Sequence, residues 1–338
     1  MSRVDLIIPT YNGSDLLRAC LRSLASSTFT DYQLWVVDDG SSEDIRGLMA
    51  SINPSAKVIR FEQNVGLARG LNVAIRQGDA DYVVLLNNDT EVEEDWLAAL
   101  VGCADEHPSA GSIASKMRLM SDRARLHSAG DYFSVRGMPG NRGVWMLDTG
   151  QYDDMRTTFS ACGGAALYRR AALNDVALPN DQVFDERLFM YCEDVDLGWR
   201  LWRAGWQCVF CPEALVYHAL SATGGGTLAS YYVSRNVWLV IARSIPAGVL
   251  PDWRRIAAYH LGRFLRDARH IRQPAARASL RGTLAGLWHA ARDWRTRPRV
   301  SVQEQRRFRA LLTDQQLRPG LPDAATLHES LASDDSAS

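Results

Sequence analysis

The chain has 338 residues, of which 46% are hydrophobic and 23% are charged. This composition is too apolar for an intrinsically disordered protein, and the length suits one large domain with a smaller appendage. A net charge of −1 excludes a nucleic-acid partner that is held by bulk positive charge, so we expect no nucleic-acid binding.

Targeting signals and membrane spans are not evident. The first residues, MSRVDLIIPTYN, run directly into a strand-like segment without the apolar run or the small-residue cleavage site of a secretory signal. No segment reaches the roughly 18 apolar residues that a membrane-spanning helix needs. The nearest, residues 237–250, contains Arg243 and Pro246. We therefore expect a cytoplasmic protein.

Six cysteines show one paired spacing, Cys208-Val-Phe-Cys211. Because the sequence offers no second pair to complete a zinc site, we predict that these two are buried thiols.

The first hundred residues alternate between strand and helix patterns. Buried strands are predicted at 4–10, within 32–41 (YQLWVVDDGS, ending in carboxylates), at 57–61 and at 82–87. Helices are predicted at 14–24, 43–50, 67–77 and 94–104, with Ser14 and Asp15 capping the first helix. Apolar strands that alternate with helices predict a mostly parallel sheet covered on both faces. Ligands of such a sheet bind at the carboxyl ends of its strands.

Polar residues follow each of these four strands. They are Thr10-Tyr11-Asn12, Asp38-Asp39, Gln63-Asn64 and Asn87-Asn88-Asp89. Asn and Asp are also ordinary turn residues, but their recurrence at four strand ends favours a binding site. Asp89, with Asn87 on the same face of the extended chain, is a candidate ligand for a divalent cation that bridges a phosphate.

The rest of the chain is less regular at first and then helical. Residues 111–160 predict irregular strands and a loop over the rim of the sheet, and 159–173 predict a strand followed by a short helix. EDVDLGWRLWRAGW, residues 193–206, is an amphipathic helix that ends at Gly205, and 207–218 returns as a strand. Everything beyond about residue 228 is predicted to be helical.

Six segments resemble a known family. IIPTYNG, VVDDGSSED, NVGLARGLN, LLNNDT, GGAALYRR and FDERLFMYCEDVDLGWRLWRAGW stand in the order and approximate spacing of family 2 of the inverting glycosyltransferases, especially its bacterial rhamnosyltransferase-like members. The resemblance spans about residues 3–240. It implies an α/β enzyme of GT-A fold, with a central sheet flanked by helices and a C-terminal helical extension.

The resemblance also implies a division of the chain. It places a catalytic domain at 1–228, with a nucleotide-sugar half at about 1–115 and an acceptor half at about 116–228. A helical extension would follow at 229–315, and a polar, flexible tail at 316–338.

Catalytic and metal-binding roles follow from the same resemblance. The metal motif of the family, which binds Mg²⁺ or Mn²⁺ and the donor diphosphate, matches Asn87 and Asp89. Position 87 is an amide here, so Asp89 carries the ligand role, and His218 matches a second ligand. Asp194 matches the general base, although acids in a first helical turn also serve as caps.

Donor and acceptor residues are implied in the same way. Asp39 would accept from the N3–H of uracil or thymine, the Thr10-Tyr11 turn would pack on that ring, and Arg69 would pair with phosphate. Arg235 would hold a diphosphate or would be ordinary helix-surface charge. The donor set is Thr10, Tyr11, Asp39, Asn64, Gly66, Arg69, Asn87 and Asn88, and the acceptor set is Gly163, Gly164, Glu193 and Arg235.

The implied reaction moves a sugar, with rhamnose favoured, from a dTDP- or UDP-linked donor to a hydroxyl of a growing surface glycan, such as a lipid-linked oligosaccharide of lipopolysaccharide. A sugar nucleotidyltransferase would need a Gly-rich, Lys-bearing loop after the first strand, and PTYNGSDLLR contains none. A catalytically inactive scaffold or carbohydrate-binding protein is the other alternative.

The C-terminal helices leave two interpretations open. The apolar run 237–250 is followed by arginines at 254, 255, 263, 266 and 269, which favours peripheral contact with the inner face of the plasma membrane. The same helices also fit an ordinary cap on the catalytic domain.

Overall fold

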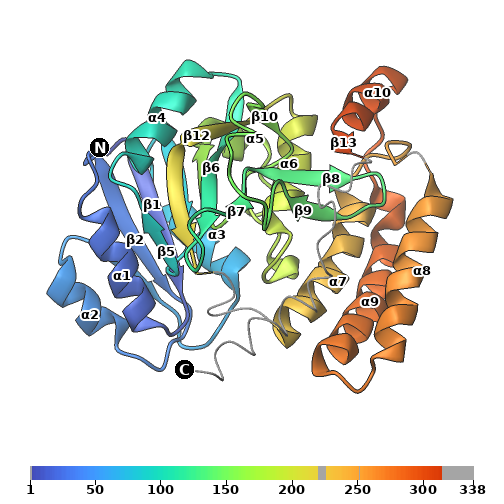
Figure 1. The fold of residues 1–338 in the computed structure, drawn as a ribbon, viewed down its shortest axis with the longest axis horizontal. Helices are drawn as coiled ribbons and strands as arrows, with labels where there is room; N and C mark the ends of the chain where they lie inside the picture. Colours follow the sequence, from blue (N-terminus) through green and yellow to red (C-terminus); the bar gives the residue numbers. More distant parts are fainter. Residues whose placement is uncertain (1, 220–225, 251, 314–338) are drawn as a thin grey trace.

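A ten-stranded mixed sheet forms the centre of the computed structural model, which describes residues 2–219, 226–250 and 252–313 (Figure 1). Its main path runs β10-β12-β6-β11-β4-β1-β2-β3, with β5 paired to β12 and β7 to β6. Four strands are parallel to one another, namely β1 (Val4–Thr10), β2 (Tyr32–Asp38), β3 (Lys57–Arg60) and β4 (Tyr82–Leu86). These strands confirm the predicted strand and helix alternation. The predicted tail at 316–338 lies outside the described residues.

Beyond β4 the sheet becomes mixed. The added strands are β5 (Thr90–Val92), β6 (Ala110–Leu119), β7 (Leu126–Ser128), β10 (Thr157–Thr158), β11 (Ala165–Arg169) and β12 (Gln207–His218). The prediction of irregular structure from residue 111 was wrong for β6, which is a long strand between β11 and β12. Most of its residues are small or polar, yet almost all are buried, because the strand is covered on both faces.

Helices cover both faces of this sheet. One face packs on α1 (Ser14–Leu24), α2 (Ile45–Ile52) and α4 (Trp96–Glu106), and the other on α3 (Leu67–Gln77), α5 (Arg170–Asp175) and α6 (Glu193–Arg203). The predicted cap of α1 was wrong. Gly13 is the N-cap residue, and the Glu43 carboxylate of the next loop accepts from the backbone N–H groups of Gly13 and Ser14.

A third hydrophobic cluster joins α6 to the C-terminal helices. These are α7 (Thr227–Arg243), α8 (Trp253–Arg269), α9 (Pro274–Asp293) and α10 (Val302–Ala310), with a short η2 (Trp294–Thr296). Trp199 and Trp202 of α6 pack there with Val240 and Ile241 of α7, while other α6 residues face the sheet. Helix α6 is therefore buried on opposite sides, and the C-terminal helices help to fix its position.

Close helix packing holds α9 on α7. A Cβ atom on Gly282 would lie 2.2 Å from the carbonyl oxygen of Tyr231, and one on Gly286 would lie 2.5 Å from that of Arg235. Only glycine allows this approach of the two backbones. A small sheet, β8 (Asp131–Ser134), β9 (Pro139–Asn141) and β13 (Leu312–Thr313), completes this side of the molecule (Figure 1).

The apolar run 237–250 belongs to this third cluster. Val237, Val240, Ile241, Ile245, Val249 and Leu250 are all buried in it. The prediction that this run lies on a membrane surface was therefore wrong, because its apolar side chains form part of the core. In the described part of the chain, no helix has the length and hydropathy needed to span a bilayer.

Candidate active site

The ends of the parallel strands meet at one rim, as predicted. The register places Thr10 of β1 beside Asp38 of β2, and Asp38 beside Arg60 of β3. Hydrogen bonds then tie the loops together. The Asn88 side chain of the β4 loop donates to Thr10 Oγ1 at 3.0 Å, and the Asp39 backbone N–H donates to the Thr10 carbonyl at 2.9 Å.

Asp89 and His218 meet at this rim although 129 residues separate them. The Asp89 Oδ1 and His218 Nε2 atoms lie 3.0 Å apart. The contact arises because Asp89 directly precedes β5, whose Thr90 pairs with His218 at the end of β12. The Ala219 N–H also donates to the Asp89 carbonyl, so backbone pairing fixes both side chains.

The geometry of this pair fits two ligands of one divalent ion. Adjacent ligands of an octahedral ion with bonds of about 2.1 Å lie about 3.0 Å apart, which matches the observed Asp89 to His218 spacing. Within residues 2–219, 226–250 and 252–313, no three His, Cys, Asp or Glu side chains gather as a metal centre. The chain would thus supply two ligands and leave the others to phosphate oxygens and water, as is usual for Mg²⁺.

A second buried histidine lies behind His218. The His127 Nδ1 and His218 Nδ1 atoms lie 3.1 Å apart, and the two rings are 4.7 Å apart between centroids. Burial and the neighbouring His218 hold the pKa of His127 well below its usual value, so His127 is neutral. No sequence pattern predicted His127. Its only signal is a histidine in the short polar segment RLHSAGD.

Asp194 stands at the start of α6 and faces the end of β11. Its Oδ2 accepts from the Gly163 N–H at 3.0 Å, and its Oδ1 accepts from the Val195 N–H at 2.8 Å. The Gly164 carbonyl accepts from the Asn87 N–H, so this corner adjoins the Asn87 to Asp89 loop. A Cβ atom on Gly164 would lie 3.3 Å from Asn87 Nδ2, which explains the small residue there.

Three carboxyl groups share this corner, but their environments differ. Burial, and then the charge of Asp194, raise the pKa of Glu193 to about 8. Burial, then the charge of Asp194, hold the pKa of Asp131 well above its usual value. Burial also raises the pKa of Asp194, but hydrogen bonds from backbone N–H groups lower it. Asp194 is therefore the carboxyl best stabilised in its ionised form.

The loop before Asp194 holds an unusual backbone conformation. Phe189, Tyr191 and Cys192 all have positive φ angles, of 66°, 66° and 65°. Such conformations are costly for residues other than glycine and persist only where the surroundings impose them. Here the Asn236 amide of α7 donates to the carbonyls at 188, 190 and 191, which ties this loop to the C-terminal helices.

Glu193 gives a testable consequence for stability. Its pKa is about 8 in the folded protein and 4.5 in a free chain. The stability that its protonated form contributes to the fold is therefore fully present below pH 4.5 and is lost as the pH rises through 8. We expect Glu193→Gln to remove this loss. Urea unfolding should show a free energy of unfolding about 2 to 4 kcal/mol above wild type near pH 9, with little difference near pH 5. A difference that is equal at both pH values would contradict the assignment.

The donor-side residues occupy several kinds of position. Asp39 accepts from the N–H groups of Val65 and Gly66 at 2.7 and 3.0 Å, which leaves one lone pair on each of its oxygens for a ligand. Thr10 and Asn88 are buried against each other, whereas the Tyr11 ring is 46% exposed beside them. Tyr11 is thus the aromatic surface that this rim offers to a planar base.

Gly66 is needed for a protein contact. Its φ angle is +90°, and a Cβ atom there would lie 2.4 Å from the Phe189 ring. Gly66 is one of the residues predicted for the donor side, and its close neighbour is this ring, which stacks on Tyr232 of α7. Gly66 therefore connects the donor-side loop to the segment that precedes Asp194.

Three predicted residues show no contact with this cluster. Asn64 and Arg69 are exposed on the β3 to α3 segment. Arg235 of α7 donates to the Arg187 carbonyl and to Asn236 Oδ1, so its contacts lie at the junction of α7 with η1 (Glu186–Leu188). Those bonds give Arg235 a structural role at this junction, which neither of its two predicted roles included.

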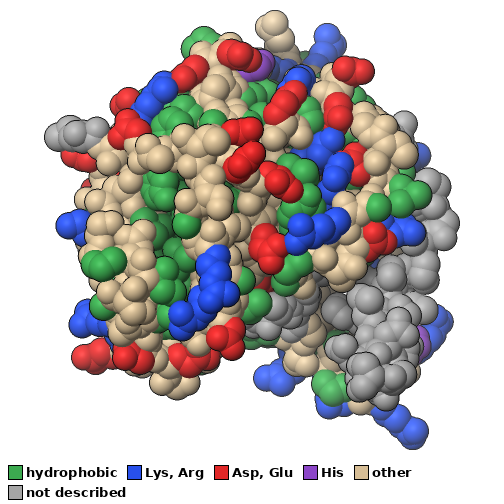
Figure 2. Space-filling model, turned by 60° about the vertical axis from the view of Figure 1, so that its left-hand side comes forward, with side chains coloured by type: hydrophobic (Ala, Val, Ile, Leu, Met, Phe, Trp, Pro, Cys, Tyr) green, Lys and Arg blue, Asp and Glu red, His purple; other side chains and the backbone are tan. Residues whose placement is uncertain are grey.

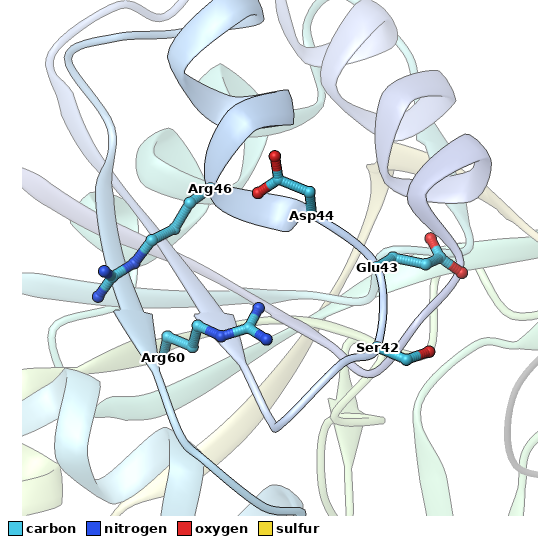
Figure 3. A pocket seen from close by; sticks show the side chains of 5 residues that line it. All are labelled: Ser42, Glu43, Asp44, Arg46 and Arg60. Carbon is cyan, nitrogen blue, oxygen red and sulfur yellow. The ribbon is translucent and has the colours of Figure 1, made fainter.

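A cavity of about 310 Å³ opens beside the β2 to α2 loop, lined by Ser42, Glu43, Asp44, Arg46 and Arg60 (Figure 3). Arg60 donates there to Asp38 and to the Ser41 carbonyl, and Asp38 in turn accepts from the Ser41 N–H. Asp38 is therefore engaged in holding this loop. The cavity does not include Asp89, Asp194 or His218, so it is not the candidate site.

Comparisons with known proteins identify a family for this chain. Residues 5–177 match Glycosyl transferase family 2. An N-acetylglucosaminyl-diphospho-decaprenol L-rhamnosyltransferase of Mycobacterium tuberculosis (strain CDC 1551 / Oshkosh) is 28% identical over 257 residues, covering 69% of this chain and 81% of that protein.

Two solved structures share the fold. S. aureus TarS (residues 1–349) is 22% identical, with a TM-score of 0.50 over 72% of this chain and 66% of that one. A mannosyltransferase from Pyrobaculum calidifontis, solved with GDP-Man and Mn²⁺, is 17% identical, with a TM-score of 0.51 over 98% and 80%. The match over residues 5–177, together with this GT-A fold, shows that the chain is a glycosyltransferase of family 2.

Proposed function

We propose that this glycosyltransferase transfers a sugar, with rhamnose favoured, from a dTDP- or UDP-linked donor to a hydroxyl of a lipid-linked surface glycan, with inversion. One observation carries the proposal. The Asp194 carboxylate, whose negative charge is stabilised by two backbone N–H groups, lies next to the rim of the sheet. That rim holds the Asp89 and His218 pair.

Asp194 acts as the general base. Its carboxylate is held by the Gly163 and Val195 N–H groups, while burial keeps Glu193 neutral at pH 7. An ionised carboxylate beside a neutral carboxylic acid allows one group to take the proton of the acceptor hydroxyl and the other to donate a hydrogen bond. Gly163 leaves space beside both carboxyls, because a Cβ atom there would lie 3.6 Å from Asp194 Oδ2 and 3.7 Å from Glu193 Oε1.

The donor occupies the rim of the parallel strands. Asp39 accepts from the N3–H of the uracil or thymine ring, and the Tyr11 ring packs on that ring. Asn64, Gly66 and Arg69 border the nucleotide. Asp89 and His218 hold Mg²⁺ or Mn²⁺, with Asn87 and Asn88 supporting that loop. When bound, the ion stabilises negative charge on the leaving diphosphate.

The choice of sugar and acceptor is supported by the mycobacterial relative. Its name describes transfer of L-rhamnose to a sugar linked to a lipid diphosphate. Such an acceptor lies at a membrane surface, so the enzyme works at the inner face of the plasma membrane. Gly164 belongs to the acceptor side, where the general base Asp194 adjoins the start of β11.

A donor screen tests the proposal. The protein is incubated with Mn²⁺ and with dTDP-rhamnose, UDP-N-acetylglucosamine or GDP-mannose, with a lipid-diphosphate N-acetylglucosamine acceptor, and release of nucleoside diphosphate is measured. We expect dTDP-rhamnose to give the fastest acceptor-dependent release. Preference for GDP-mannose would overturn the donor assignment, and transfer with retained configuration would overturn the role of Asp194.

A further inference from the structure

Positive charge is concentrated in the α8–α9 hairpin. Residues 253–295 contain ten arginines and only two acidic residues, Asp267 and Asp293, whereas the whole chain has a net charge of −1. Both aspartates have partners, since Asp267 accepts from Ser279 and Asp293 pairs with Arg187 and Arg243. The hairpin therefore carries a formal charge of +8.

Large apolar side chains are exposed among these arginines. Leu261 and Leu265 of α8 are 58% and 47% exposed, and Leu284 and Trp288 of α9 are 57% and 58% exposed. Leu261, Leu265 and Arg269 follow one another at four-residue steps, and Arg281, Leu284 and Trp288 follow at steps of three and four. Each set therefore lies along one side of its helix. We call these six residues, three on the outward side of each helix, the basic face.

The basic face points away from the protein core. The opposite sides of the two helices are occupied, because Ile256 of α8 lies in the third cluster and Gly282 and Gly286 of α9 contact the α7 backbone. The two helices lie at the outer edge of the molecule, beyond α7 (Figure 1). Near one end of the hairpin, the rings of Trp253 and Trp294 are in contact, with 5.1 Å between their centroids, and both side chains are partly exposed.

We propose that the basic face docks on an anionic lipid surface. Helices that lie in the membrane interface combine arginines, which attract anionic headgroups, with leucine and tryptophan side chains that enter the boundary of the acyl chains. The basic face has this composition, whereas the face shown in Figure 2 carries acidic and basic side chains interspersed. This inference rests on the proposed function, because it names the surface that brings the enzyme to a lipid-linked acceptor.

Two other occupants fit the basic face less well. A second copy of this chain would place one hairpin of charge +8 against another in a two-fold contact, which is repulsive. A nucleic acid would neutralise the arginines but would leave Leu261, Leu284 and Trp288 without an apolar partner. A lipid surface satisfies both the charges and the apolar side chains.

Flotation with vesicles tests the docking. The full-length protein is mixed with phosphatidylcholine vesicles or with vesicles that also contain phosphatidylglycerol, and the bound fraction is measured. We expect at least about tenfold stronger binding to the anionic vesicles, weakened by added salt. Recovery of all protein in the lipid-free fraction would overturn the proposal.

Paired variants separate charge from apolar contact. Arg269→Glu with Arg281→Glu should weaken binding by at least about tenfold, and Leu261→Ser with Leu284→Ser by about fivefold. Arg22→Glu with Arg76→Glu makes the same change of net charge on exposed turns of α1 and α3, and should change binding by less than about twofold. Equal losses of vesicle binding in the two charge variants would mean that only the net charge matters, and would overturn the proposal that the basic face makes the contact.

The readout is independent of catalysis. Flotation requires neither donor nor acceptor, so a failure to bind vesicles leaves sugar transfer untouched, and a failure of transfer leaves docking untouched. Sedimentation at increasing protein concentration provides the last check. A dimer that is lost in Leu261→Ser with Leu284→Ser would assign the basic face to a second copy and overturn the proposal.

Discussion

Asp194→Asn should lower turnover by about 10²- to 10⁴-fold while donor binding is retained. The amide keeps the size of the carboxyl, but its single oxygen can accept from only one of the Gly163 and Val195 N–H groups, so the start of α6 keeps one of these two bonds. It cannot take a proton from the acceptor hydroxyl at neutral pH. Turnover is measured with a saturating donor, and donor affinity by calorimetry. Near-normal turnover would remove Asp194 from the role of base.

Asp131→Asn is the matched control for this experiment. Asp131 is a buried carboxyl in the same corner, bonded to Ser160 and Asn141, and burial holds its pKa well above the usual value. Because Asp131 is not the proposed base, replacing it by an amide of the same size should keep turnover within about tenfold of wild type. If Asp131→Asn instead lost activity and Asp194→Asn kept it, the base assignment would pass to Asp131.

The pH dependence of turnover gives a second check on the base. A general base must be ionised, so turnover should fall as the pH is lowered through the pKa of Asp194. Burial raises that pKa, so the decrease in turnover should occur at a pH above 3.8, the usual pKa of an aspartate. A rate that stays constant down to about pH 4 would contradict an environment of this kind.

The sequence predicted the donor side of the fold because its signals are local. Unbroken apolar strands such as Tyr82–Leu86 indicate a sheet covered on both faces, and the polar residues that follow them must then share one edge. The structure confirms the alternation of strands and helices and brings Thr10, Asp39 and Asn88 together. No long-range contact had to be known to reach this result.

The metal pair depends on contacts that no local pattern reveals. Asp89 meets His218 only because β5 pairs with β12, and a three-residue strand such as β5 leaves almost no periodic signal. His127 reaches His218 from a further strand, β7. The polar residues at the strand ends indicated Asp89, the resemblance to a known family supplied His218, and His127 required the structure.

The C-terminal region shows why apolar content alone misleads. Residues 237–250 are the most continuous apolar run of this region, and that continuity reflects burial in the core between α6 and α8. The exposed basic face has fewer apolar residues, spaced by three and four among arginines. The spacing, rather than the length of an apolar run, distinguishes a helix at an interface from one inside the protein.

Asp89→Ala and His218→Ala should each weaken Mn²⁺ binding by more than about 100-fold, because each removes one of the two proposed protein ligands and even outer partners of a metal site contribute about 10- to 100-fold. Binding is measured by titration with Mn²⁺ in the presence of dTDP or UDP, followed by paramagnetic resonance, so the result does not depend on turnover. His107→Ala is the matched control, because His107 lies at the end of α4, bonded to the Cys103 carbonyl. Unchanged binding in Asp89→Ala would reject the pair as a metal site.

His127→Phe should reduce Mn²⁺ affinity by an intermediate amount, which tests whether His127 orients the ring of His218. If His218 Nε2 gives its lone pair to an ion, its Nδ1 carries the proton and donates to His127 Nδ1, which lies 3.1 Å away. A phenyl ring fills the same space but accepts no such bond, so the orientation and basicity of His218 are lost while Asp89 remains. Mn²⁺ affinity should fall by about 10- to 100-fold, less than in His218→Ala. Equal losses in the two variants would mean that His127 does more than orient its neighbour, and no loss would mean that β5 and β12 alone hold His218 in place.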